Sequence, residues 1–274
     1  MPTILRTGRA TLRIDDHGGA VHGRPALVFL HYWGGSAATW RKVVACLSGE
    51  ARCVAVNQRG WGGSTVADGR YDLHSMADDV LAVIARLGLG RVVLVGHSMG
   101  GKVAQIVAQA KPAEVGGLVL VAPAPPTPMP IPEEARRAML QSYQSAAGVE
   151  QALRVLAGPS LTAGERQGVV ADTLAGEPGA KRAWTEQGMA SDLGIAPGDV
   201  QVPLTLLVGS LDQVEQPERL RAVFGAVTPQ ARFVEVPGVG HLLPLEAPEA
   251  VASACRDMLA AVADRRSAVP SPLA

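Results

Sequence analysis

Short runs of apolar residues alternate along the chain with longer stretches in which apolar positions recur at helical spacing. Uninterrupted apolar runs of this length are typical of strands buried on both faces, as in a parallel sheet covered by helices. Two weaker strands are expected near Leu5 and Leu12, as an antiparallel start. The other expected strands are 26–30, 53–56, 91–95, 118–122, 204–208 and 231–236, and the expected helices are 38–47, 76–87, 99–110, 217–227 and 248–263. The pattern predicts an α/β protein with a mostly parallel eight-stranded sheet and helices on both faces.

The alternation of strands and helices is interrupted once. Prolines crowd the segment from Pro123 to Pro132, and because proline fixes φ and lacks an amide proton, this segment is expected to be extended. Helical spacing follows over 133–156, then a Gly-rich, weakly helical region to Gly198, and the sheet pattern resumes at Val202. We therefore expect a core of residues 1–122 and 201–264, an inserted helical cap of residues 123–200, and a flexible tail of residues 265–274.

Composition and charge narrow the classes of partner. The 274 residues are 47% hydrophobic and carry 25 basic and 25 acidic side chains. A protein that binds nucleic acid or an anionic membrane surface usually has a basic surplus, so neither partner is expected. The three scattered cysteines show no metal-ligand spacing, and we expect no metal and no cofactor. Without an apolar run at the amino terminus or a membrane-length apolar stretch, a cytoplasmic monomer or homodimer is expected.

The run Gly96-His97-Ser98-Met99-Gly100 lies between an expected strand and an expected helix. A serine on such a tight strand-to-helix turn is strained, and the residues two before and two after it must be small. The turn lifts the hydroxyl above the sheet and puts it at a helix amino terminus, where developing negative charge is favoured. Ser98 is therefore the candidate nucleophile, with a simple helix-capping serine as the alternative.

A serine nucleophile needs a base, usually a histidine oriented by a third group. His241 follows the last expected strand in a Gly-rich loop, Gly238-Val239-Gly240-His241, that can carry the imidazole over the sheet. The other five histidines lie in turns, on the surface or beside motif glycines: His17, His22, His31, His74 and His97. We expect His241 to titrate near the ordinary value for histidine, about 6.5.

The orienting acid is expected between the serine and the histidine in chain order. Asp212 lies just after the expected strand 204–208, at the edge of the sheet where active-site loops gather, and Glu215 is the alternative. The preceding strand ends in alanine and proline and offers no acid. An oxyanion hole also needs two N–H donors: the amide of Met99, which follows the nucleophile, and an amide from the loop His31-Tyr32-Trp33-Gly34-Gly35, where we expect Trp33.

With these residues in place, the chain resembles the α/β-hydrolase superfamily, in its lid-bearing esterase, lactonase and peroxidase-like branch. The elbow Gly96-His97-Ser98-Met99-Gly100-Gly101 is similar to the family motif, and His31-Tyr32-Trp33-Gly34-Gly35 resembles the family's His-Gly-x-x-Gly loop, with Tyr32 where glycine is usual. The turn from Asn57 to Ser64 resembles Asp-x-Arg-Gly-x-Gly-x-Ser, with Asn57 in place of aspartate. The resemblance covers about residues 26–263 apart from the cap, and it implies the fold and the triad better than the substrate.

Ser98 favours acyl chemistry, because dehalogenases and epoxide hydrolases of this fold use an aspartate nucleophile. The expected reaction is hydrolysis of a small carboxylic ester or lactone through an acyl-enzyme, with an uncharged medium-chain or cyclic substrate. The alternatives are an acyltransferase, a cofactor-free perhydrolase or haloperoxidase, a slow-turnover ligand receptor, or an inactive relative. Gly34 stands where relatives that use peroxide carry proline, which disfavours that alternative.

The substrate pocket is expected to be lined by large apolar residues of the cap together with Tyr32, since such pockets are mostly apolar. Each of these cap residues could equally pack the cap on the core. The residues chosen for the pocket are Tyr32, Met129, Tyr143, Trp184 and Met189.

Overall fold

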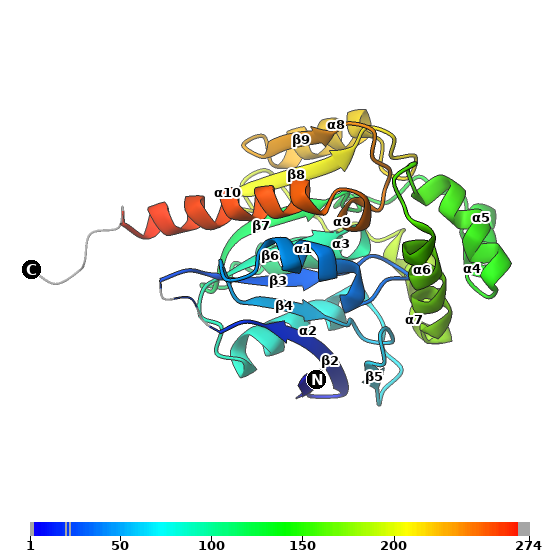
Figure 1. Cartoon of the computed structure of the whole chain (residues 1–274), viewed down its shortest axis with the longest axis horizontal. Coiled ribbons are helices and arrows are strands. Elements are labelled where there is room, and N and C mark those ends of the chain that lie inside the picture. The colour runs from blue at the N-terminus through cyan, green and yellow to red at the C-terminus, as the bar shows by residue number, and fades with distance from the viewer. Residues whose placement is uncertain (1–2, 20, 22, 268–274) are drawn as a thin grey trace, which may run out of the picture.

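A twisted sheet forms the centre of the computed structural model, which describes residues 3–19, 21 and 23–267 (Figure 1). Its strand order is β1-β2-β4-β3-β6-β7-β8-β9, and β5 pairs with β2 beside this path. The pairings among β4, β3, β6, β7, β8 and β9 are parallel, whereas β2 pairs antiparallel with β1, β4 and β5. The strands are β1 (Thr3–Thr7), β2 (Ala10–His17), β3 (Ala26–Leu30), β4 (Cys53–Val56), β5 (Thr65–Val66), β6 (Val92–His97), β7 (Val115–Val121), β8 (Leu204–Gly209) and β9 (Arg232–Val236).

The expected fold class is confirmed, including the antiparallel start of the sheet. Every residue of β3, β4, β6, β7 and β8 is buried, as the uninterrupted apolar runs predicted. The sheet has one strand more than expected, because β5 is two residues long and leaves no periodic pattern to detect. Strand β7 begins three residues earlier than expected, at Val115.

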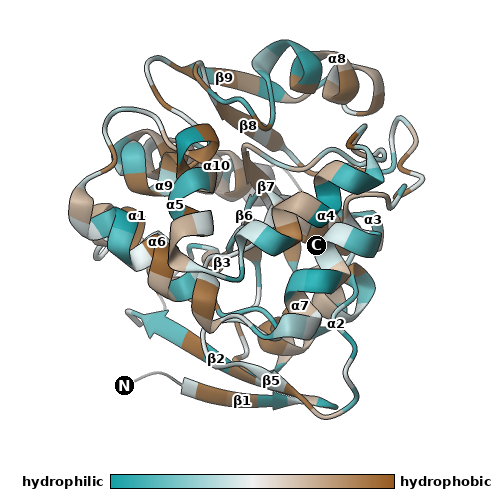
Figure 2. Ribbon diagram, turned by 90° about the vertical axis from the view of Figure 1, so that its right-hand side faces the viewer, coloured by the Kyte–Doolittle hydropathy of each residue, from teal (hydrophilic) through white to brown (hydrophobic). Residues whose placement is uncertain are grey.

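Helices cover the sheet on both faces. One apolar cluster joins the sheet to α2, α3 and α8, and a second joins the opposite face to α1 and α10. In Figure 2 the hydrophobic colour dominates β8, whereas hydrophobic and hydrophilic colours alternate along the helices. The helices are η1 (Ala37–Trp40), α1 (Arg41–Cys46), α2 (Leu73–Arg86), α3 (Met99–Gln109), α4 (Glu133–Ser142), α5 (Ala146–Leu156), α6 (Ala163–Ala175), α7 (Pro178–Ala183), η2 (Trp184–Gly188), α8 (Pro217–Val227), α9 (Leu243–Glu246) and α10 (Pro248–Ser267).

Capping side chains explain two differences between expected and observed helices. Helix α2 begins three residues earlier than its apolar pattern, at Leu73, because the Asp72 carboxylate accepts a hydrogen bond from the Ser75 amide over 2.9 Å. The helical spacing over 133–156 is divided into α4 and α5, because the Ser145 hydroxyl caps a new helix by accepting from the Gly148 amide over 3.1 Å.

The segment 123–200, which we call the cap segment, contains α4, α5, α6, α7 and η2. These helices lie beyond the carboxyl ends of the central strands (Figure 1). Its proline-rich start has neither helix nor strand, as expected. The entry and exit of the segment run side by side, since Met129 donates to the Met189 carbonyl and Leu193 to the Pro126 carbonyl, each over 2.8 Å.

Helix α3 holds the two ends of the cap segment through a stripe of long polar side chains. The Lys102 amine donates to the carbonyls of Ser191 (2.6 Å) and Thr127 (3.3 Å). One and two turns further along, Gln105 and Gln109 donate to carbonyls of the same two connections. The helix that starts at Ser98 therefore also anchors the cap segment.

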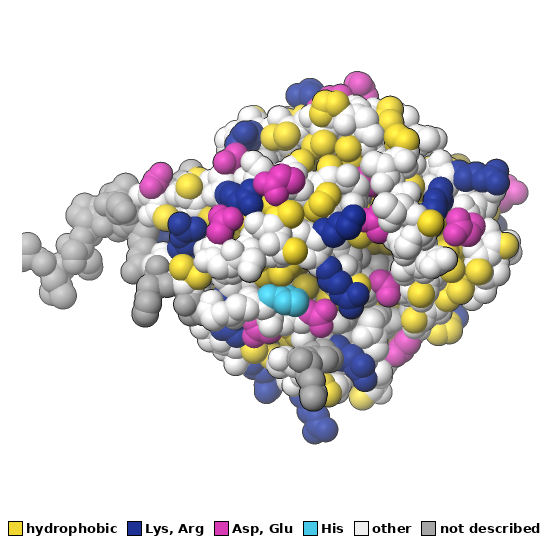
Figure 3. Space-filling view, in the orientation of Figure 1, with side chains coloured by type: hydrophobic (Ala, Val, Ile, Leu, Met, Phe, Trp, Pro, Cys, Tyr) yellow, Lys and Arg dark blue, Asp and Glu magenta, His cyan; other side chains and the backbone are white. Residues whose placement is uncertain are grey.

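Helix α10 continues to Ser267, three residues into the expected tail, and residues 268–274 lie outside the described part of the chain, as does His22. Basic and acidic side chains are interspersed on the face seen in Figure 3, in keeping with the balanced charge. Across residues 3–19, 21 and 23–267, no helix is long and apolar enough to span a membrane.

Candidate active site

Ser98 lies on a strained turn between β6 and α3. Its φ of 51° and ψ of −114° are unusual for a residue with a side chain, and such a conformation persists only where its surroundings enforce it. The Ser98 amide donates to the Val121 carbonyl over 3.0 Å, and the Ser98 carbonyl accepts from the Ala124 amide over 3.0 Å. The strained turn predicted from the sequence is confirmed, and the start of the cap segment helps to hold it.

The flanking glycines are required by close backbone contacts. A Cβ atom on Gly96 would lie 2.5 Å from the Gly100 carbonyl oxygen, and a Cβ atom on Gly100 would lie 2.3 Å from the Leu30 carbonyl oxygen. Both distances are far below van der Waals contact. The expectation that both positions must be small is therefore confirmed.

The loops after β8 and β9 bring Asp212 and His241 together. The imidazole donates from Nδ1 to Oδ2 of Asp212 over 2.8 Å, and the other carboxylate oxygen, Oδ1, accepts from the amides of Val214 (2.8 Å) and Glu215 (2.9 Å). The neutral ring therefore carries its proton on Nδ1 and leaves Nε2 free to accept one. Asp212 and not Glu215 makes the hydrogen bond expected of the orienting acid.

The pKa of His241 is raised above the ordinary value of 6.5, contrary to our expectation. Burial is the largest effect and disfavours the imidazolium. The negative charge and hydrogen bond of Asp212, followed by the charges of Glu215 and Glu246, outweigh it. These partners come from separate parts of the fold, so the sequence alone did not reveal the shift.

The backbone around His241 is fastened on two sides. His97, the residue before Ser98, donates from Nε2 to the His241 carbonyl over 2.8 Å, and the His241 amide donates to the carbonyl of Leu156 over 2.8 Å. Glu246 accepts hydrogen bonds from the amides of Gly158 (2.8 Å) and Gly240 (3.4 Å). The loop with the candidate base is thus attached both to the elbow and to the end of α5.

The loop after β3 contains Trp33, whose amide is the expected second oxyanion donor. The Tyr32 carbonyl accepts from His31 Nδ1 over 2.8 Å and from the Gly35 amide over 3.0 Å. Because a trans peptide points its N–H opposite to its C=O, these two bonds also set the direction of the Trp33 N–H. The other expected donor, the Met99 amide, is in the first turn of α3, where helix amides lack intrahelical partners.

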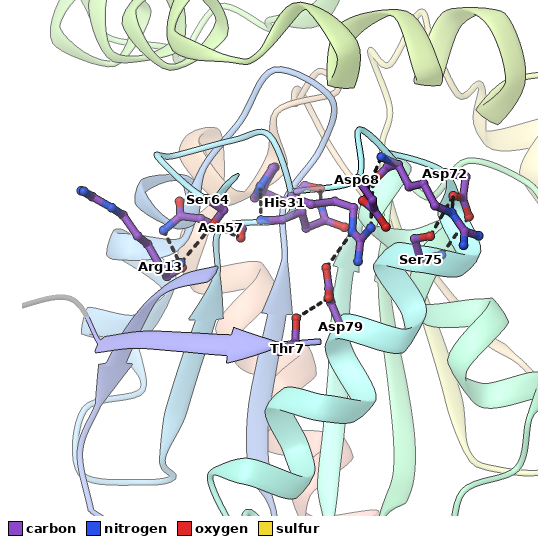
Figure 4. A network of polar contacts seen from close by, with 12 residues as sticks. Thr7, Arg13, His31, Asn57, Ser64, Asp68, Asp72, Ser75 and Asp79 are labelled. Atoms are coloured by element: carbon purple, nitrogen blue, oxygen red, sulfur yellow. Dashed lines mark hydrogen bonds and ion pairs between the residues drawn. The ribbon is translucent and has the colours of Figure 1, made fainter. Parts of the chain in front are cut away.

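A polar network beneath this loop orients His31 (Figure 4). Its Nε2 accepts from the Gln58 amide over 3.1 Å, so the ring is neutral and protonated on Nδ1. Burial lowers its pKa to about 4, only partly opposed by the hydrogen bond to the Tyr32 carbonyl. Asn57 accepts from the Ala37 amide (2.8 Å) and donates to the Arg13 carbonyl (2.9 Å). A carboxylate cannot donate, which explains asparagine where the family motif has aspartate.

Residues of the cap segment also contact the loop after β3, residues 31–36, which we call the oxyanion loop after its expected role. The rings of Trp33 and Tyr143 stack with centroids 3.8 Å apart and an interplanar angle of 11°. The Thr173 hydroxyl donates to the Gly34 carbonyl over 3.1 Å, and the Ser36 hydroxyl donates to Asp172 over 2.6 Å. Cap segment and oxyanion loop therefore form one packed unit.

The elbow, the Asp212–His241 pair and the loop after β3 meet at the carboxyl ends of the central strands. Residues 25–149 match the family model described as alpha/beta hydrolase fold. The whole chain superposes on a thermophilic esterase from Thermogutta terrifontis with a TM-score of 0.81; the two are 28% identical, over 96% of this chain and 99% of the esterase. The chain therefore has the α/β-hydrolase fold.

Two curated relatives of this chain extend the comparison. It is 27% identical to the 2-(acetamidomethylene)succinate hydrolase of Mesorhizobium japonicum, over 88% of this chain and 89% of the relative. It is 29% identical to the dihydrolipoyllysine-residue acetyltransferase component of the acetoin cleaving system of Pseudomonas putida, over 91% of this chain and 67% of the relative.

The five residues expected to line a substrate pocket have different surroundings in the structure. The Tyr32 ring packs against His97 and beside Gly35, and Tyr143 stacks on Trp33. Met129 and Met189 are buried, and their main chains pair at the ends of the cap segment. Trp184 alone of the five lines a cavity of about 250 Å³, whose wall includes Met99 and the start of α2. Their contact with substrate stays a prediction.

Three buried or partly buried polar residues around the candidate site have contacts that the sequence pattern does not predict: Lys102, Glu215 and Glu246. Their signal is burial of a polar group, which a single sequence does not display. Where the structure describes side chains, no group of three or more His, Cys, Asp or Glu residues is placed to hold a metal ion.

Proposed function

We propose that this chain is a serine hydrolase that cleaves small carboxylic esters or lactones through an acyl-enzyme. Ser98 is the nucleophile, His241 the general base and acid, and Asp212 the residue that orients His241. The observation that carries the proposal is the hydrogen bond from His241 Nδ1 to Asp212 Oδ2, at the same sheet edge as a serine held at a φ of 51°. Such a combination is the arrangement needed to activate a serine hydroxyl.

In the first half of the reaction, Ser98 Oγ attacks the acyl carbon while its proton passes to His241 Nε2. The resulting alkoxide accepts hydrogen bonds from the amides of Trp33 and Met99, which supply the transition-state stabilisation. The alkoxide then collapses, the bond to the leaving oxygen breaks, and His241 gives its proton to that oxygen. In the second half, His241 takes a proton from a water molecule, which attacks the acyl-enzyme in the same way, and the carboxylic acid is released from Ser98.

The local backbone favours water over peroxide as the acceptor. Gly34 has a φ of 98°, which proline cannot adopt, and a Cβ there would lie 2.8 Å from the Tyr143 ring. The proline of peroxide-using relatives therefore has no place in this loop. Aromatic rings pack against the oxyanion loop, which supports an uncharged medium-chain or cyclic acyl group.

The test is hydrolysis of p-nitrophenyl esters of two to eight acyl carbons and of simple lactones. We expect turnover by the wild type and its loss in Ser98→Ala and His241→Ala, with Ser48→Ala, an exposed serine after α1, as the matched control. A fluorophosphonate probe should label Ser98 in the wild type and in Ser48→Ala. Ester turnover that survives Ser98→Ala, or a label on another residue, would refute the proposal.

A second candidate is acyl transfer to an acceptor other than water. It draws support from the relative named as an acetyltransferase component, and the same acyl-enzyme would serve it. Adding an alcohol or a thiol to the ester assay separates the two, because a transferase forms the transfer product in preference to the free acid at millimolar acceptor.

A further inference from the structure

Glu215 places a second carboxyl group beside the candidate triad. Its side chain is 0% exposed, and neither carboxyl oxygen has a hydrogen-bond partner among the described residues. The nearest cation is Arg219, one helical turn away, with Nη1 3.6 Å from Oε2, which is an ion-pair distance and not a hydrogen bond. A buried carboxyl group without donors is uncommon and costly.

The Asp212 turn is what directs Glu215 inward. Oδ1 of Asp212 accepts from the amides of Val214 and Glu215, so the chain folds around the carboxylate that holds His241. The backbone of Glu215 is therefore part of the support of Asp212, and its side chain is fixed relative to the Asp212–His241 pair.

Four charged or titratable groups surround the Glu215 carboxyl. Asp212 lies in the same loop as Glu215, and Arg219 lies in α8. Lys102 belongs to α3 and His241 to the loop before α9. The Lys102 amine is hydrogen-bonded to the carbonyls of Ser191 and Thr127, so it contributes charge without bonding to the carboxyl.

Burial raises the pKa of Glu215 to about 8, although Arg219, His241 and Lys102 favour the anion; Asp212 adds to the rise. Glu215 is thus a neutral acid in weakly acidic solution and an anion above that value. Because Glu215 and His241 interact, ionisation of the acid makes the imidazole harder to deprotonate, and the imidazolium makes the acid easier to ionise.

A glutamine or leucine would fill the same space without burying an ionisable group, so packing does not explain a glutamate. We propose that Glu215 is a positioning residue that acts through His241: when ionised, it adds a second negative charge behind the Asp212–His241 pair and makes the imidazole a stronger base. This inference rests on the proposed function only in assigning His241 the role of base.

The pH dependence of turnover distinguishes this role from a structural one. In the wild type, kcat/KM should rise with pH over a broad range, first as His241 becomes neutral and again as Glu215 ionises and strengthens the base. In Glu215→Gln only the first rise remains, because a glutamine side chain does not ionise. The matched control is Glu218→Gln, an exposed acid on α8, which should keep the wild-type profile.

A second measurement reads His241 in the resting protein. Nitrogen chemical shifts of ¹⁵N-labelled histidine, followed from pH 5 to 9.5, should show a second step for His241 as Glu215 ionises, at a pH of about 8, in the wild type and in Glu218→Gln, and only one step in Glu215→Gln. This readout needs no substrate, so it still tests the inference if Ser98→Ala shows the proposed hydrolysis to be wrong.

Arg219→Gln provides a test that leaves the buried glutamate in place. Loss of the nearest cation should shift the second rise in kcat/KM to higher pH. If Glu215→Gln does not fold, Arg219→Gln takes its place as the test. Superimposable pH profiles together with an unchanged His241 titration in the folded variants would overturn the inference.

Discussion

His97 Nε2 donates a hydrogen bond to the main-chain carbonyl of His241 over 2.8 Å, and the two rings lie 5.2 Å apart. The residue before the proposed nucleophile therefore holds the backbone of the proposed base. Burial, and then the nearby His241, lower the pKa of His97 well below its ordinary value, so this contact is made by a neutral ring at physiological pH.

Replacing His97 should impair catalysis through the position of His241. We expect His97→Phe to lower kcat/KM by about 10–100-fold, because displacing a catalytic group by an ångström can cost about that much. His97→Gln retains an N–H donor and should recover part of the loss. Steady-state kinetics and the rate of fluorophosphonate labelling measure both; a His97→Phe enzyme within twofold of the wild type, with an unchanged melting temperature, would contradict the role.

Activity should fall as the pH is lowered through the raised pKa of His241. The base works only in its neutral form, so protonation removes it, and the midpoint of the loss in kcat/KM should lie above pH 6.5. Asp212→Asn should move this midpoint to lower pH, because a charge that favours imidazolium is gone.

The same substitution should lower kcat by about 10³–10⁴-fold, because an amide can stabilise the wrong tautomer of the imidazole. Asp78→Asn, at an exposed position of α2, is the control and should match the wild type. A normal kcat in Asp212→Asn would show that another group orients His241.

Contact between the cap segment and the oxyanion loop can be tested with two matched threonines. Thr173 donates to the Gly34 carbonyl and Thr228 to the Phe224 carbonyl, both over 3.1 Å and both buried. Thr173→Val should cost about 1–3 kcal/mol of unfolding free energy, since the buried Gly34 carbonyl loses its hydrogen bond. Thr228→Val should cost less, since the Phe224 carbonyl still accepts from the Thr228 amide over 2.7 Å. Only Thr173→Val should also lower kcat/KM, by on the order of tenfold. The variant loses a contact that holds the oxyanion loop, and the stabilisation of the transition state by that loop decreases with it. Equal values of kcat/KM in the two variants would mean that the contact between Thr173 and the oxyanion loop does not contribute to catalysis.

Gly100 and Gly225 should respond in opposite directions to alanine. A Cβ at Gly100 would lie 2.3 Å from the Leu30 carbonyl oxygen, and we expect Gly100→Ala to lose about 3 kcal/mol or more of unfolding free energy. A Cβ at Gly225, inside α8, would meet nothing within 4 Å from other parts of the described chain, so Gly225→Ala should gain about 0.5–1 kcal/mol. Urea denaturation measures both, and a stable Gly100→Ala protein would mean that the elbow can open.

Stability should depend on pH through Glu215. Its pKa is about 8 in the folded protein against an ordinary value of 4.5, so the unfolded chain releases this proton at lower pH than the folded protein does. The contribution of Glu215 to stability therefore falls as the pH rises from 4.5 to 8. The melting temperature of Glu215→Gln relative to the wild type should increase over that range and be constant below it. A constant difference at all pH values would mean that Glu215 ionises normally.

Local patterns were enough to predict most elements of the fold. Fully apolar runs such as 26–30 and 53–56 have the same bounds as β3 and β4, because burial on both faces of a strand disfavours polar residues. The two-residue strand β5 and the division of 133–156 escaped prediction. The first is too short to be periodic, and the second depends on one capping serine within a continuous helical pattern.

The sequence by itself determined the elbow, since a serine between glycines at a strand-to-helix junction constrains its own backbone. It also pointed to Asp212 and His241, because chain order and strand ends restrict where such residues can stand. Only the tertiary structure decided that Asp212 rather than Glu215 bonds to His241, that His97 holds the His241 carbonyl, and that Glu215 is buried beside them. These are contacts between residues 29 to 144 positions apart, and their energies depend on burial and distance, which no local pattern records.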